Sequence, residues 1–223
     1  MLLTNADYMY GTIYDRTDKI ALNLKIGDCI SFGSFVPDID GCEVKVRVPM
    51  IWHVIDREDN KLKLLSYFFF EHIGFWSVDN SSNKILWGNT EIRKDLNEKF
   101  FSECFSENEQ KAILTTEVKT KTSNSNCVTT QDKLYVPSLE DIKNIPEHLK
   151  IGRGLTIEKD KGNIPTIGLM YCFYWLRDPS EYEGRNLVVQ GYANSQLVID
   201  NLDYYSDEVG VRAVMWVDAE KLE

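Results

Sequence analysis

The distribution of apolar and polar residues divides the chain into short blocks, and the clearest blocks lie near its C-terminal end. Three runs that are rich in aromatic and β-branched residues predict strands at residues 170–177, 186–190 and 209–217. The first and third runs each hold one arginine among apolar neighbours, Arg177 and Arg212. An arginine side chain keeps its charge, so its burial requires carboxylate or carbonyl partners. We therefore favour a structural role for both arginines over ligand binding.

The N-terminal part of the chain predicts an irregular lead-in followed by strands. Residues 1–25 mix tyrosines with charged residues without a clear period, and they allow one short strand. The apolar runs that follow, with turn residues between them, predict strands at residues 27–36, 44–48, 50–56 and 61–66. The polar residues Glu58, Asp59 and Asn60 separate the last two runs and predict a hairpin.

Two or three short helices are expected in the middle of the chain. From Thr90 onward the apolar residues recur at spacings near three and four, which indicates a helix with Thr90 as its cap. Ser106 and Glu109 have the spacing of a capping box and predict a second helix directly after the first. Ser138 is the expected cap of a third helix, which Pro146 ends.

Two segments predict irregular surface structure. Residues 117–132 are rich in Thr, Ser, Asn and Lys, which favours a mobile polar loop. Residues 133–136 then predict a short strand. Residues 146–167 contain three glycines and Pro165, and we expect them to form a long surface excursion before the three C-terminal strands.

Composition and charge exclude one broad class of function. The chain has 223 residues, of which 43% are hydrophobic and 27% are charged, and this balance is typical of a folded domain with a single core. The formal net charge is −10, and no cluster of lysines and arginines is present. A protein that binds nucleic acid through its phosphates needs a basic patch, so we expect no nucleic-acid partner.

Several features bear on the cellular compartment. The first residues lack the basic and apolar regions of a secretory signal, and no apolar run approaches the roughly 18 residues of a membrane span. The five cysteines are widely spaced without a C-x-x-C pair, which is typical of reduced thiols rather than of a disulfide or zinc framework. We expect a cytoplasmic protein with no membrane partner, although a virion protein would show the same features.

Spaced motifs along residues 26–217 resemble, in order, those of an uncharacterised bacterial domain family. The matching segments are Gly27-Asp28, Ile51-Trp52-His53-Val54-Ile55-Asp56, Trp87-Gly88-Asn89-Thr90, Trp175-Leu176-Arg177 and Gly210-Val211-Arg212. The chain departs from that family at Asp178, where serine is frequent, and at Ala213-Val214, where a proline–alanine pair is usual. The residues that we take as structural anchors of the domain are Trp52, Arg93, Trp175, Arg177, Arg212 and Trp216.

The tail of that family is similar to the C-type-lectin-like fold of bacterial surface and phage receptor-binding modules. The resemblance implies an α+β domain over residues 26–223, with short helices packed on twisted antiparallel sheets and with ligands bound by loops. The same fold hosts a formylglycine-generating oxidase, which needs paired cysteines near the C-terminal end. Here Cys172 stands alone within an apolar run, so we do not expect that activity.

No catalytic, cofactor or metal site is predicted from the residues. The three histidines, His53, His72 and His148, lack a surrounding catalytic motif. The calcium-dependent sugar-binding triplets of the lectin group are absent. Four acidic residues carry oxygens that would suit a hard cation, but their spacing matches no known loop and a solvated acidic loop is favoured; they are Asp200, Asp203, Asp207 and Glu208.

Loops between residues 178 and 208 are the expected contact surface for a protein or glycan ligand. Tyrosine and arginine give large contact area with a polar tip, and the predicted contact residues are Tyr182, Arg185, Tyr192, Asn194, Tyr204 and Tyr205. In the alternative interpretation these tyrosines only cover the sheet. We therefore expect a non-catalytic binding domain of unspecified oligomeric state. The alternative class is an acidic intracellular inhibitor or regulator of a basic partner protein.

Overall fold

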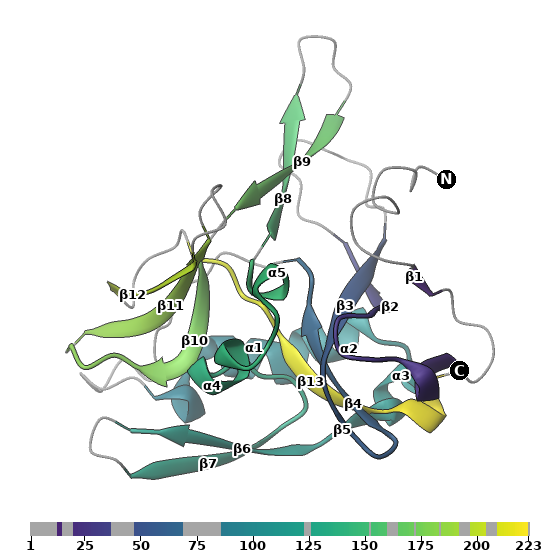
Figure 1. Ribbon diagram of the computed structural model, residues 1–223, viewed down its shortest axis with the longest axis horizontal. Helices are drawn as coiled ribbons and strands as arrows, with labels where there is room; N and C mark the ends of the chain where they lie inside the picture. The colour runs from purple at the N-terminus through teal and green to yellow at the C-terminus, as the bar shows by residue number, and fades with distance from the viewer. Residues whose placement is uncertain are drawn as a thin grey trace.

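The computed structural model describes residues 13–14, 20–36, 47–68, 86–122, 126–151, 153–159, 165–171, 173–182, 184–191, 197–203 and 209–222. Within these residues the chain forms one six-stranded sheet and three smaller sheets, with short helices beside them (Figure 1). Nearly all neighbouring strands are antiparallel. The architecture is therefore α+β and dominated by sheets, which confirms the expected fold class at this level.

The six-stranded sheet, called here the central sheet, is built around the predicted hairpin. Its strand order is β1-β2-β3-β4-β13-β5, and only β1 and β2 are parallel. The strands are β1 (Ile13–Tyr14), β2 (Cys29–Phe35), β3 (Val48–Glu58), β4 (Lys61–Ser66), β13 (Val214–Asp218) and β5 (Ile113–Leu114). Asp59 lies in the turn between β3 and β4 with a φ of 50°, a conformation in which aspartate is enriched. The expected hairpin is confirmed.

Three smaller sheets surround the central sheet. The outer sheet consists of β10 (Tyr174–Pro179), β11 (Arg185–Gly191) and β12 (Leu197–Asp203). Two hairpins complete the set: β6 (Thr116–Lys121) pairs with β7 (Cys127–Asp132), and β8 (Arg153–Lys159) pairs with β9 (Pro165–Tyr171). Figure 1 shows the β8–β9 hairpin extending away from the rest of the described chain.

The helices begin at the predicted caps. Thr90 caps α1 (Glu91–Asp95) by accepting a hydrogen bond from the backbone N–H of Arg93 at 3.2 Å. The helix continues through a π-helical segment, η3 (Leu96–Phe100), into α2 (Phe101–Cys104). Ser106 and Ser138 form the capping boxes of the next two helices, as expected. The remaining helical segments are α3 (Glu107–Ala112), α4 (Leu139–Lys143), α5 (Glu147–Lys150), η1 (Ile20–Asn23), η2 (Trp87–Asn89) and η4 (Ala219–Lys221).

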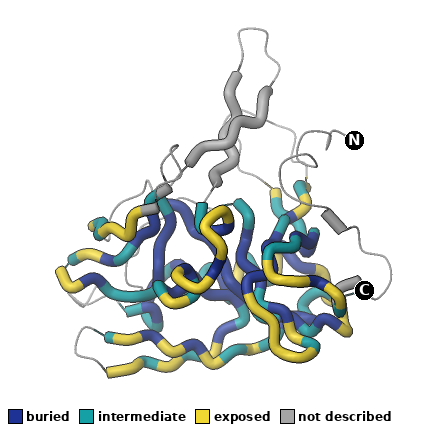
Figure 2. Tube along the Cα trace, viewed as in Figure 1, coloured by how far each residue is buried: buried dark blue, intermediate teal, exposed yellow. Residues whose placement is uncertain are grey.

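One continuous core lies where the central sheet, the outer sheet and the helices meet. Buried positions run through β3, β4, β13, β10 and β11, whereas exposed positions lie along the outer edges (Figure 2). Trp52, Trp87 and Trp175 are all fully buried. The indole N–H of Trp52 donates to the carbonyl of Phe32 at 2.7 Å, so this large side chain is buried with its polar atom satisfied.

The prediction of a polar loop at residues 117–132 is wrong. These residues form most of the β6–β7 hairpin, in which Val118 and Thr120 are buried and the residues between and beside them are exposed. Threonine is enriched in strands because its branched side chain fits a pleated surface. The polar composition therefore concealed the alternation of buried and exposed side chains that is typical of a strand. Residues 123–125, between the two strands, lie outside the described residues.

The C-terminal part also differs from the expectation. The segment expected to form a long surface excursion, residues 146–167, contains regular structure, namely α5, β8 and the start of β9. The strand expected at 170–177 is divided, since β9 ends at Tyr171 and β10 begins at Tyr174. Residues 197–203 form β12, within a segment that was expected to be loop. The strand at 186–190 is confirmed as part of β11.

The last and the smaller predicted strands are only partly regular. Of the strand expected at 209–217, residues 214–217 belong to β13, while residues 209–213 are buried without forming a continuous strand. The strand expected at 133–136 is reduced to a single bridge between Tyr135 and Val214. Most of the lead-in at 1–25, and residues 44–46 of another expected strand, lie outside the described residues.

Candidate functional site

A groove of about 620 Å³ lies between the central sheet, β6, α4 and β10, and we call it the charged groove. Its floor includes two cationic and two aromatic side chains, namely Lys63, Arg177, Tyr135 and Trp216. Three exposed acidic residues lie around it, namely Asp56, Glu117 and Glu140. The volume lies in the range of small-ligand pockets, but the lining is more polar than in most of them.

Strand register places these side chains together. Lys63 lies opposite Trp216 on β13 and opposite Asp56 on β3. The register between β3 and β4 shifts between Val54 and Asp56, so the strand carries a bulge beside the groove. Because of this bulge, Ile55 and Asp56 both line the groove although they are consecutive in a strand.

Asp141 joins the cations of the charged groove. Its carboxylate forms an ion pair with Lys63 and another with Arg177 at 2.9 Å. It also accepts hydrogen bonds of 2.8 Å from the N–H and the hydroxyl of Ser138, as the second residue of the capping box. Burial alone would raise the pKa of Asp141, but the charges of Arg177 and Lys63 hold it well below its usual range. Asp141 is therefore a carboxylate at neutral pH.

Arg177 is only partly satisfied by the surrounding protein. Its Nη1 donates to the carbonyl of Val136 at 3.0 Å and to Asp141 at 2.9 Å. Its guanidinium carbon lies 5.3 Å from the centroid of the Tyr135 ring. Its Nε is buried and has no hydrogen-bond partner among the described residues. Burial also raises the pKa of Tyr135, so that its phenol stays protonated.

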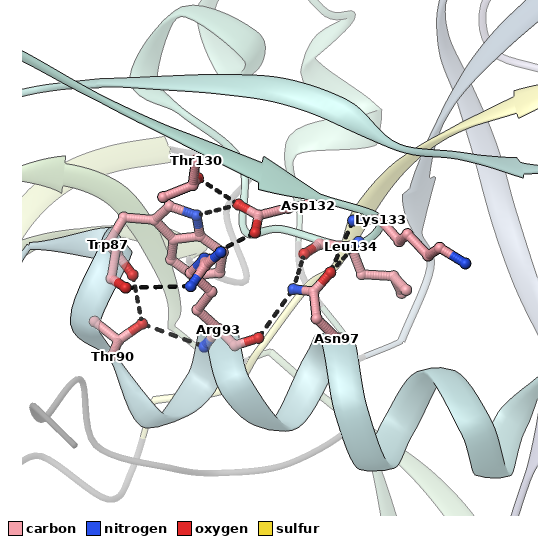
Figure 3. Close-up of polar contacts among 9 residues, drawn as sticks. Trp87, Thr90, Arg93, Asn97, Thr130, Asp132, Lys133 and Leu134 are labelled. Atoms are coloured by element: carbon pink, nitrogen blue, oxygen red, sulfur yellow. Dashed lines mark hydrogen bonds and ion pairs between the residues drawn. The ribbon is translucent and has the colours of Figure 1, made fainter.

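A second polar cluster joins the β6–β7 hairpin to α1 (Figure 3). Asp132, which is buried, accepts hydrogen bonds from the indole of Trp87 at 2.8 Å, from Nε of Arg93 at 2.7 Å and from Thr130 at 2.6 Å. Asn97 lies beside this cluster and bonds four backbone groups, those of Arg93, Lys133 and Leu134. Because these groups satisfy one another, we interpret the cluster as structural.

A cysteine–histidine pair, which was not predicted, lies in the central sheet. Sγ of Cys29 is 3.0 Å from Nδ1 of His53, because the two residues are direct partners in the β2–β3 register. Burial raises the pKa of Cys29 to about 11 and lowers the pKa of His53 to about 3. Both groups are therefore neutral at pH 7, and the pair lacks the thiolate that a nucleophile requires. Cys29 and His53 are 24 positions apart in the sequence, so only the register of the two strands could have predicted this pair.

The structure places two of the predicted contact residues next to each other. Tyr182 lies between β10 and β11 with 63% of its surface exposed, and Arg185 is exposed at the start of β11. Tyr192, Asn194, Tyr204 and Tyr205 lie outside the described residues. The β11–β12 pairing begins with Arg185 opposite Asp203 and ends with Gly191 opposite Leu197. Arg185 therefore lies at one end of this pair of strands, and the Gly191–Leu197 pair lies at the other end.

The acidic residues considered for a cation are not all in a loop. Asp200 and Asp203 belong to β12, and side chains three positions apart in a strand point to opposite faces. Asp207 and Glu208 lie outside the described residues. Among the residues that the structure describes, no group of three His, Cys, Asp or Glu side chains is placed to hold a metal ion.

The anchor residues from the sequence occupy varied environments. Arg212 is fully buried and donates to the carbonyl of Ser66 at 2.8 Å and to that of Leu149 at 2.9 Å. Its guanidinium lies 5.0 Å from the ring centroid of Tyr174, whose pKa is raised to about 12 by burial. Trp216 is only half-buried and lines the charged groove, as does Arg177. A role beyond anchoring is thus open to these last two residues.

Residues 59–219 match the family described as a domain of unknown function, DUF6273, and the chain belongs to this family. The match begins in the turn between β3 and β4 and ends in η4, so β1, β2 and β3 precede it.

Neither the curated proteins nor the solved structures include a match to the chain. In the part of the chain that the structure describes, every helix is too short or too polar to cross a bilayer.

Proposed function

We propose that the protein is a non-catalytic binding domain that contacts a protein or glycan through the outer sheet and its connecting loops. One observation supports this most strongly: three of the five large apolar side chains that are exposed in the described residues lie in or beside this sheet. They are Tyr182, Val198 and Ile199. The outer sheet and its loops therefore carry more of these exposed apolar side chains than any other part of the described chain.

The chemistry of these residues suits recognition. Tyr182 and Arg185 belong to the residue types that contribute most to binding energy at interfaces. Val198 and Ile199 are consecutive in β12, so they lie on opposite faces of the strand, and both are exposed. In the described residues β12 pairs only with β11, which leaves its other edge open to a partner.

A C-type-lectin-like fold is part of this proposal. Antiparallel sheets with few short helices, and a final strand, β13, that closes the central sheet between β4 and β5, are compatible with such a fold. In that fold loops and strand ends carry the ligand site. The outer sheet and its connections would then be the equivalent surface here.

A regulator that binds a basic partner protein is the second candidate, and the net charge of −10 favours it. Salt separates the two candidates. Binding that depends on charge weakens steeply between low and physiological ionic strength, whereas contacts through tyrosine and branched aliphatic side chains change little.

The experiment that tests the proposed function is an array of bacterial and host glycans, probed with the purified protein in calcium and in chelator. Binding in both arms supports a metal-independent glycan-binding domain. Binding lost in chelator would assign a cation to the site, with the carboxylates of residues 200–208 as the first residues to substitute. A blank array in both arms would contradict glycan recognition and leave a protein ligand.

A further inference from the structure

We propose that the charged groove is a second binding site, which receives the carboxylate of a small ligand between Arg177 and Lys63. The groove lies between the central sheet and β10, and it is lined by neither Tyr182 nor Arg185. The inference therefore goes beyond the outer-sheet contact surface and does not depend on it.

The unused donors of Arg177 are the first argument. Both of its hydrogen bonds use Nη1, and Nε has no partner among the described residues although it is buried. Nε and Nη2 together form the side of a guanidinium that binds a carboxylate through two parallel hydrogen bonds. A buried donor without a partner is uncommon in folded proteins, so Nε is a candidate donor to a ligand of the groove.

The charge of the groove floor is the second argument. Lys63 and Arg177 share one carboxylate, that of Asp141, so the floor carries one more positive than negative charge. Both cations are largely shielded from solvent, with 14% and 11% of their side chains exposed. Where water is largely excluded, an unbalanced charge attracts an opposite charge more strongly than it would at the surface.

The acidic rim restricts which anion fits. Asp56 and Glu140 are exposed beside the groove, while Glu117 pairs with Lys119 at 3.1 Å. Negative charges at the rim repel a phosphate dianion about twice as strongly as a carboxylate. Because Asp56 and Glu140 outnumber the surplus positive charge of the floor, the groove attracts an anion only close to Lys63 and Arg177, where a carboxylate with one negative charge meets the least repulsion.

The aromatic floor indicates what the carboxylate is attached to. Trp216 is half-buried, and Nζ of Lys63 lies 5.7 Å from the centroid of its ring. Such a ring offers flat apolar surface next to the proposed carboxylate position. The volume of about 620 Å³ suits a small molecule. An acidic amino acid and a sugar acid share this chemistry of a carboxylate on a compact body.

The test is an NMR titration that follows the indole N–H signal of Trp216, assigned with a Trp216→Phe variant. Sodium glutamate and sodium glucuronate are the two probes, and glutamine and glucose are their uncharged counterparts. We expect a saturable shift of this signal with at least one acid and none with the uncharged compounds. The acid that saturates at lower concentration identifies the source as amino acid or sugar. The proposal would be overturned if neither acid gave a saturable shift of this signal, or if the uncharged compounds gave the same shift as the acids.

Two variants make the assignment specific. Arg177→Lys keeps the charge but cannot bind a carboxylate through two points, so we expect about tenfold weaker binding. Since Arg177 also contacts Val136 and Asp141, a variant at the exposed rim gives an independent test. Glu140→Gln removes one repelling charge and should tighten binding severalfold, whereas Glu98→Gln, an exposed position outside the groove, should leave it unchanged. Identical affinity in the Glu140→Gln and Glu98→Gln variants would contradict the site.

Discussion

Arg177 of the outer sheet donates to Asp141 of α4 at 2.9 Å, and Asp141 is also the third residue of that helix, whose side chain completes the capping box with Ser138. The other oxygen of the same carboxylate pairs with Lys63 of the central sheet, 78 positions away in the chain. One side chain therefore connects two sheets and a helix. It also determines the charge of the groove that these elements enclose.

Loss of this carboxylate should destabilise the fold strongly. Asp141→Ala leaves two buried cations without their shared carboxylate and removes the carboxylate half of the Ser138 capping box, and we expect the free energy of unfolding to fall by about 3–5 kcal/mol. Urea denaturation followed by tryptophan fluorescence measures this change. The matched control is Glu147→Ala, which breaks an ion pair whose carboxylate is 73% exposed, and it should cost only about 0–1 kcal/mol. Equal losses in the two variants would contradict the role of Asp141.

Stability should depend on pH through His53. Burial, and then the positive charge of Arg212, lower the pKa of His53 from 6.5 to about 3. Between these pH values the unfolded chain binds a proton at His53 that the folded chain does not bind. The stability contributed by neutral His53 is complete above pH 6.5 and declines as pH falls toward 3, by about 1.4 kcal/mol per pH unit.

This pH dependence can be isolated by substitution. Urea denaturation of the wild type and of His53→Gln between pH 7 and pH 5 should give a shallower pH slope for the variant. Lys94→Gln, at an exposed position on α1, should keep the slope of the wild type. The slope is compared rather than the absolute stability, because His53 is packed in the core. The same slope in His53→Gln as in the wild type would refute the assignment.

Asn97 should be sensitive to a change that preserves its shape. In Asn97→Asp the backbone N–H groups of Lys133 and Leu134 keep an acceptor, but the carbonyls of Arg93 and Leu134 then face a carboxylate in place of the amide donor. We expect a loss of about 2–3 kcal/mol at neutral pH. Asn108→Asp, exposed in the first turn of α3, should be nearly neutral. Thermal or urea unfolding of both proteins checks this.

Gly33 should not tolerate a side chain. It has a φ of 75°, and an added Cβ would lie 2.5 Å from Cε of Met50 and 2.7 Å from Cε1 of Phe105. Gly33→Ala therefore combines backbone strain with overpacking, and we expect a loss of about 2–4 kcal/mol. Gly27 has a φ of 98° but no atom within 4 Å of such a Cβ. Gly27→Ala should cost only the backbone strain, about 1–2 kcal/mol. Equal losses of stability in Gly33→Ala and Gly27→Ala would contradict the overpacking at Gly33, because they would show that Met50 and Phe105 move aside without cost.

The sequence predicted those parts of the fold whose signals are local. The Thr90, Ser106 and Ser138 caps and the β3–β4 hairpin depend on residues a few positions apart, and the structure has all of them. The β6–β7 hairpin was missed because its threonines and lysines resemble a loop by composition, although Val118 and Thr120 keep a strand period.

The candidate site could not be predicted in the same way. Lys63, Asp141 and Arg177 lie in three separate segments, and only the packing of β4, α4 and β10 brings them together. The contact of Cys29 with His53 likewise depends on the register of two strands. Tyr182 and Arg185 were predicted as contact residues from their residue types alone. Residue type indicates that a side chain is exposed, but it does not indicate which side chains form one surface.

The most direct test of the outer-sheet contact surface compares three proteins on the same glycan array: the wild type, the double variant Tyr182→Ala and Arg185→Ala, and Val36→Ala as an exposed apolar control from outside the outer sheet. The account predicts the same bound glycans for the wild type and Val36→Ala. For the double variant it predicts at least about tenfold weaker binding, because exposed tyrosine and arginine contacts each contribute about 1–2 kcal/mol. Equal binding by all three proteins would contradict the claim that the outer sheet is the contact surface.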